Sequence, residues 1–200
     1  SHYLFKHALI QDAAYDAMLR RQRREVHKKI ADTLEKDFPE TIQERPELLA
    51  HHRTEAGQPW LAAPLWASAG SIATMRGAFV EAVQQLRHAM ECLESADHSD
   101  EQDGFSQRKR DELEYQINVP LGIATLALKG YAAPELGGIY DRRMELCETL
   151  DDAMGQLHAK WAMASWRIVR NDIEMSLEIG REMLEMSRAM NDDGAVMEAR

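Results

Sequence analysis

Residues 66–89 read WASAGSIATMRGAFVEAVQQLRHA, two helical segments joined at a glycine. The small residues Gly70 and Ala82 are expected to let the two helices approach each other closely. The larger side chains of Trp66 and Leu86 then fill the space beside them, and Gly77 gives the backbone freedom at the turn. This stretch therefore predicts a closely packed pair of helices.

The pair has the spacing of a tetratricopeptide unit, in the positions Trp66, Ala69, Gly70, Ala73, Gly77, Ala82, Leu86 and Ala89. A second unit aligns through Ala124, Ala127, Tyr131, Leu136 and Tyr140, and a third through Ala164, Asn171, Ser176, Gly180 and Met183. Because the turn positions are unevenly spaced, we interpret the chain as a degenerate array of helix pairs. An irregular helical bundle is the alternative.

Apolar residues recur every three or four positions along almost the whole chain, as in helices. No segment long enough to form a strand alternates apolar and polar residues with period two. The fold is therefore predicted to be all-α. The expected helices span about 20–37, 47–56, 61–76, 78–95, 109–128, 133–150, 152–169, 173–190 and 194–200. On the first of these, Val26 and Ile30 are expected to be buried. The polar tract 97–107 is expected to be a loop.

The composition indicates the class of protein. Of the 200 residues, 44% are hydrophobic and 29% charged, which is typical of a folded chain. The net charge of -10 argues against nucleic acid as a partner, because phosphate backbones select basic surfaces. Cys92 and Cys147 are isolated, as in proteins of a reducing compartment. The uncharged stretch 119–128 has about half the length of a membrane helix. We therefore expect a cytoplasmic protein without a membrane partner.

Four segments carry a resemblance to a known family. They are FKHALIQDAAY at 5–15, PELLAHH at 46–52, EAG at 55–57 and KGYAAPE at 129–135. In this order the chain resembles bacterial signalling proteins in which an adenylate/guanylate cyclase domain is joined to a signal-transduction ATPase of the STAND/AAA type and then to tetratricopeptide-like repeats.

The resemblance implies a division of the chain. Residues 1–38 would be the end of a winged-helix-like subdomain of an upstream ATPase module, and 39–60 a connecting helix. Residues 61–200 would be degenerate tetratricopeptide-like repeats in a right-handed solenoid, cut within a repeat. Exposed ends of such an array, with Val196 and Met197, are expected to favour a dimer.

The same resemblance implies a regulatory role. The chain would be a non-catalytic protein-interaction region of a signalling protein that makes a cyclic nucleotide. One alternative is the inducer- or partner-binding repeat region of an ATPase-type transcriptional activator, and a second is a helical enzyme of unknown type. No catalytic residue is predicted, because no nucleophile or carboxylate pair stands in a recognisable setting.

His7 is the one candidate for nucleotide contact. In ATPases of this class a histidine of the winged-helix subdomain can touch the nucleotide phosphate, and His7 resembles it; a packed or solvated histidine is the alternative reading. The chain has no G-x-x-x-x-G-K-[ST] loop, so we expect no cofactor here and ATP only in the upstream module.

Two other clusters are interpreted as structural. Adjacent side chains on a helix point about 100° apart, so His51 and His52 are not expected to serve one metal ion. The basic run that begins at Arg20 is interpreted as a solvated face or one that docks on an acidic surface.

The working surface is predicted to be a groove lined by the first helix of each pair, which would bind a protein or peptide of apolar character, beside contacts with the ATPase module. The predicted lining is Ala67, Ser71, Thr74, Met75, Leu121, Thr125, Leu128, His158, Trp161 and Ser165. Packing of Trp161 and the methionines inside the array is the alternative.

Overall fold

A computed structural model describes residues 15, 18–96 and 106–190. The helices are α2 (Arg20–Asp37), α3 (Pro39–Glu44), α4 (Pro46–Glu55), α5 (Pro59–Met75), α6 (Phe79–Ser95), α7 (Gln107–Lys129), α8 (Glu135–Thr149), α9 (Ala153–Val169) and α10 (Ile173–Met190). The described part of the chain contains no strand. The all-α prediction is confirmed, and the predicted helix at 194–200 lies outside the described residues.

The helix ends follow local chemistry. Proline is the first residue of α3, α4 and α5. Proline has no backbone N–H, and the first N–H groups of a helix have no partner within the helix, so nothing is lost at this position. The expected helices did not include α3, and the segment 39–60, expected to be a connecting helix, contains α3, α4 and the start of α5. Each short connection from α4 to α10 contains one residue of positive φ, in the order Gly57, Gly77, Gly130, Asp151 and Asn171. These residues let the chain reverse direction within a few positions.

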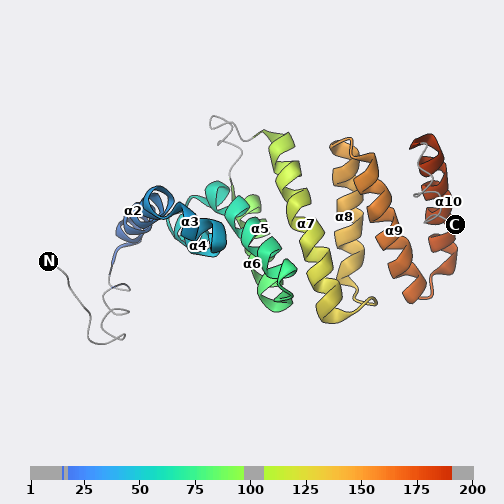
Figure 1. Cartoon of the computed structure of the whole chain (residues 1–200), viewed down its shortest axis with the longest axis horizontal. Coiled ribbons are helices and arrows are strands. Elements are labelled where there is room, and N and C mark those ends of the chain that lie inside the picture. The colour runs from blue at the N-terminus through green and yellow to red at the C-terminus, as the bar shows by residue number, and fades with distance from the viewer. Residues whose placement is uncertain (1–14, 16–17, 97–105, 191–200) are drawn as a thin grey trace.

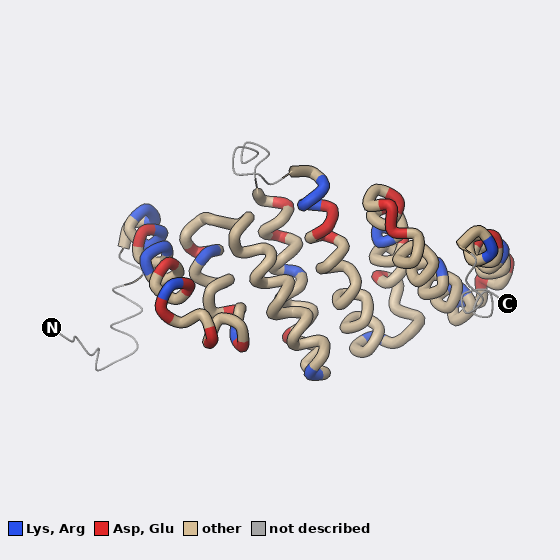
Figure 2. The backbone as a smooth tube through the Cα atoms, turned by 45° about the horizontal axis from the view of Figure 1, so that its top comes forward, with Lys and Arg blue, Asp and Glu red and all other residues tan. Residues whose placement is uncertain are grey.

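The helices lie side by side in chain order and form an elongated row (Figure 1). Consecutive helices pack against each other from α4 to α10, and α5 also packs against α7. Figure 2 shows charged residues crowded along α2, at the N-terminal end of the row. The central helix α5 contains no charged residue, which suits a helix that packs against α4, α6 and α7.

The α5–α6 pair has the close packing predicted from residues 66–89. Ala82 and Leu86 are fully buried, and a Cβ atom placed on Gly70 would lie 2.7 Å from Leu86 Cδ2. Trp66 packs against the same core and donates a hydrogen bond from Nε1 to Thr54 Oγ1 on α4 at 3.0 Å. The small residue at position 70 is therefore what allows the two helices to meet at this distance.

The buried face of α2 differs from the prediction. Val26 and Ile30 are 41% and 38% exposed, whereas His27 and Ala31 are buried. The expectation that Val26 and Ile30 are buried was wrong, because α2 packs against α4 through the adjacent side of the helix. Arg53 of α4 is buried beside that side, and a charged group there needs polar partners rather than apolar ones.

Candidate functional site

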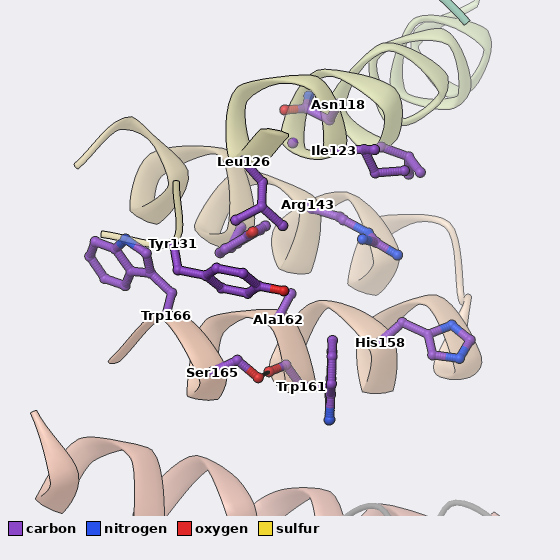
Figure 3. Close-up of a pocket in the computed structure, with 13 residues that line it drawn as sticks. Asn118, Ile123, Leu126, Tyr131, Arg143, His158, Trp161, Ala162, Ser165 and Trp166 are labelled. Carbon is purple, nitrogen blue, oxygen red and sulfur yellow. Dashed lines mark hydrogen bonds between the residues drawn. The ribbon is translucent and has the colours of Figure 1, made fainter. Parts of the chain in front are cut away.

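A pocket of about 290 Å³ opens between α7 and α9, over α8 (Figure 3). Its walls come from three helices and from the turn that follows α7. The lining residues are Asn118, Val119, Gly122, Ile123, Leu126, Tyr131, Tyr140, Arg143, His158, Trp161, Ala162, Ser165 and Trp166. Helices α5 and α7 pack together directly, whereas α7 and α9 are separated by this space.

The apolar part of the pocket has a well-supported wall. Trp166 donates a hydrogen bond from Nε1 to the Ala133 carbonyl at 2.9 Å, which holds its ring in place. The glycine at position 137 makes room for that ring, since a Cβ atom there would lie 2.7 Å from Trp166 Cη2. Across the opening, Ile123 and Trp161 are each 51% exposed. Large apolar surface is therefore available to a ligand.

The polar part of the pocket is dominated by Arg143. Its guanidinium lies 5.9 Å from the Tyr115 ring centroid, and its buried Nε has no hydrogen-bond partner among the described residues. Burial raises the pKa of Tyr140, so this phenol stays neutral near pH 7. None of the lining residues is a carboxylate. An apolar group carrying a negative charge is the chemistry that this pocket fits best.

The structure brings together three residues of the predicted groove. His158, Trp161 and Ser165 line this pocket, and Trp161 and Ser165 also line a second hollow against α10. The Ser165 hydroxyl donates its proton to the Trp161 carbonyl at 2.9 Å, so this proton is not available to donate to a ligand. Trp161 is half-exposed at the pocket mouth.

The other predicted groove residues lie elsewhere. Ala67 and Ser71 border a separate shallow hollow, and Thr74 and Met75 lie at the end of α5. The lining of the α7–α9 pocket does not include Leu121, Thr125 or Leu128. Leu121 packs against the core and Thr125 is buried, while Met75 is 80% exposed. His7 lies outside the described residues.

Sequence reasoning missed Arg143, Ile123 and Trp166 as pocket residues. Arg143 follows Arg142, which is paired with Glu114 at 2.6 Å and with Glu145 at 2.7 Å. No pattern in the sequence tells which of two adjacent arginines is paired. Helical periodicity places Tyr140 and Trp166 on packed helix faces, and this was the one feature of the sequence that could have indicated them as pocket residues.

Both cysteines are buried and free, and burial raises the pKa of each thiol. Such thiols are poor nucleophiles near neutral pH. No helix in the described part of the chain combines the length and apolar character needed to cross a membrane.

A scan for known protein families finds no match for the chain. One curated relative is 34% identical over 98 residues, an uncharacterized protein of Rhizobium meliloti (strain 1021). The matched segment is 49% of this chain and 10% of that protein. The chain therefore spans only a small part of the relative that it matches.

Proposed function

We propose that this chain is a non-catalytic, ligand-binding region of a multidomain bacterial signalling protein, built as a degenerate array of tetratricopeptide-like helix pairs. The pairs α5–α6, α7–α8 and α9–α10 and their short turns support the array. The resemblance of 5–15 and 129–135 to cyclase–ATPase fusions supports a cytoplasmic parent with a cyclase output. The much greater length of the Rhizobium relative agrees with a multidomain parent.

The observation that carries the proposal is the Arg143 guanidinium, which lines a mainly apolar pocket whose lining contains no carboxylate. A ligand carboxylate that reaches this guanidinium accepts a charge-assisted hydrogen bond, which is stronger than a neutral one. Trp161 beside it offers an exposed apolar ring. The ligand is proposed to be a peptide segment with a large apolar side chain next to a carboxylate.

Fluorescence polarisation with labelled octapeptides that place Trp or Leu beside Glu tests this proposal, with the Gln versions as comparison. The Glu peptides are expected to bind the chain more tightly than the Gln peptides. Arg143→Gln is expected to remove that preference, at a cost of about tenfold in affinity for the Glu peptides, since a charge-assisted hydrogen bond is lost. Trp161→Ala is expected to abolish binding of both kinds.

The matched control is Met75→Ala, which removes an exposed apolar side chain outside the pocket. It should leave binding unchanged, and circular dichroism should show equal helicity in all variants. Equal binding by wild type, Arg143→Gln and Trp161→Ala would rule out this pocket as the ligand site.

The second candidate is an inducer-binding region of an ATPase-type activator. The pocket volume of about 290 Å³ is at the lower end of small-molecule sites and favours it. Binding of small apolar carboxylic acids, with no binding of the peptides, would select this alternative.

A further inference from the structure

Three histidines from two helices meet at the N-terminal end of the row, far along the chain from the α7–α9 pocket. His27 lies on α2, and His51 and His52 lie on α4. One ring nitrogen from each can be chosen so that all three lie within 4.8 Å of one another. The ring centroids are separated by 5.8 Å for His27–His51, 5.0 Å for His27–His52 and 5.3 Å for His51–His52.

On α4 alone, His51 and His52 are adjacent residues and are not expected to share an ion. Adjacent side chains do diverge on a helix, but a third ligand from a crossing helix can close the space between them. The α2–α4 packing places His27 there, 24 positions before His51 in the sequence. The divergence of His51 and His52 on α4 therefore does not exclude a shared ion.

The hydrogen-bond partners of His27 allow the arrangement of a ligating histidine. Its Nε2 lies 2.9 Å from the Tyr15 hydroxyl, and its Nδ1 lies 2.8 Å from Nδ1 of His52. Metal-ligating histidines donate their second ring N–H to an oxygen, which fixes the tautomer and the ring orientation. With Nε2 donating to Tyr15, Nδ1 of His27 presents a lone pair towards His52.

The two Nδ1 atoms face each other so closely that a proton must lie between them in the metal-free protein. An ion with tetrahedral bonds of 2.0–2.1 Å places two nitrogens about 3.4 Å apart, so a modest separation of the two rings admits it.

We propose that His27, His51 and His52 bind one divalent transition-metal ion of the zinc class and thereby tie α2 to α4. Three imidazole nitrogens suit zinc and its borderline neighbours, whereas calcium and magnesium prefer oxygen ligands. His51 is exposed, so the ion can enter from solvent. The fourth position is open to water or to the nearby carboxylate of Glu55, whose charge acts on both His27 and His52.

Zinc titration of the full chain, followed by calorimetry and thermal unfolding, tests the proposal. One equivalent is expected to bind with micromolar or better affinity and to raise the Tm. Cobalt is expected to give the intense visible absorption of a tetrahedral site and to be displaced by zinc. Tyr15→Phe is expected to weaken zinc binding by about tenfold, because the tautomer of His27 is no longer held.

His51→Gln is the variant least able to disturb folding, since His51 is exposed, and it should lower zinc affinity by more than tenfold. The controls are His88→Gln and His158→Gln, two histidines outside the cluster, which should bind zinc as wild type does. The proposal is overturned if wild type binds no zinc at micromolar concentrations. It is also overturned if the triple variant of His27, His51 and His52 to Gln keeps the same stoichiometry and Tm shift. Neither result depends on the α7–α9 pocket.

Discussion

Arg53 shows how one side chain joins two helices. It lies on α4, is 5% exposed, and donates from Nη1 to Asp32 at 2.8 Å and from Nη2 to Glu35 at 2.6 Å, both on α2. Nη1 also donates to Gln58 at 2.9 Å. The side chains of Asp32 and Glu35 are 54% and 64% exposed, so water screens their charges. The free energy lost when these hydrogen bonds are broken then depends mainly on the buried Arg53 guanidinium.

Replacing Asp32 and Glu35 together with alanine is expected to lower the free energy of unfolding by about 1–2 kcal/mol, because Arg53 stays buried with Gln58 as its remaining partner. Urea unfolding followed by circular dichroism measures the change. Glu25→Ala removes an exposed carboxylate from the same helix and should change stability by less than about 0.5 kcal/mol. Equal losses in the two proteins would show that the network does not hold α2 on α4.

Among the helix pairs, α5–α6 illustrates how a single small residue sets the distance between two elements. Gly70 lies against Leu86 and near the Ala82 carbonyl, whose oxygen would be 3.3 Å from an added Cβ atom. Leu86 is fully buried and cannot swing into solvent. By contrast, an added Cβ atom at Gly138 on α8 would meet nothing within 4 Å. The two glycines are both helical and differ mainly in their surroundings.

Gly70→Ala is therefore expected to destabilise the protein by about 1–3 kcal/mol, since overpacking outweighs the gain in helix propensity. Gly138→Ala is expected to stabilise it by up to about 1 kcal/mol, through propensity alone. Thermal and urea unfolding of both variants measure the difference. A stabilising Gly70→Ala would mean that the two helices separate easily, contrary to the packing described.

In the row as a whole, each helix packs only against helices that are close to it along the chain. α5 packs against α4, α6 and α7, whereas α10 packs against α9. Apolar side chains remain exposed at this end, among them Ile168, Ile173 and Leu177. A helix supported on one side opens at lower free energy than one packed on several sides.

Amide hydrogen exchange followed by mass spectrometry should therefore show protection factors in α10 at least about tenfold below those in α5. The α5–α6 peptides serve as the internal reference in the same sample. Equal protection along the row would indicate that the chain unfolds as one unit, with no independent opening of α10.

Much of the helical content could be predicted because its causes are local. The bounds of α2 and α10 agree with the predicted ranges, and those of the other predicted helices within the described residues agree to about two positions. The close approach of the two helices at Gly70 and Ala82 was predicted because both residues lie in one helix pair. Gly57 follows α4 and has the positive φ that the residue after a helix end often adopts, which is a local preference of glycine.

The candidate sites could be predicted only in part, because their residues converge from separate helices. His158, Trp161 and Ser165 share one helix, and their spacing placed them on one face. Arg143 joins them from α8, through packing that no periodicity specifies. For the same reason the side of α2 that faces α4 was assigned wrongly, and His27 was not connected with His51 and His52.

Local sequence thus accounts for the helices, their ends and the closeness of the α5–α6 pair, since these depend on residues within one helix or within two helices joined by a short turn. Tertiary packing decided which face of each helix is buried, which of Arg142 and Arg143 is left without a carboxylate, and where three histidines meet. The difference has a physical cause: backbone hydrogen bonds of a helix form within four residues, whereas burial and charge pairing depend on neighbours that only the folded chain supplies.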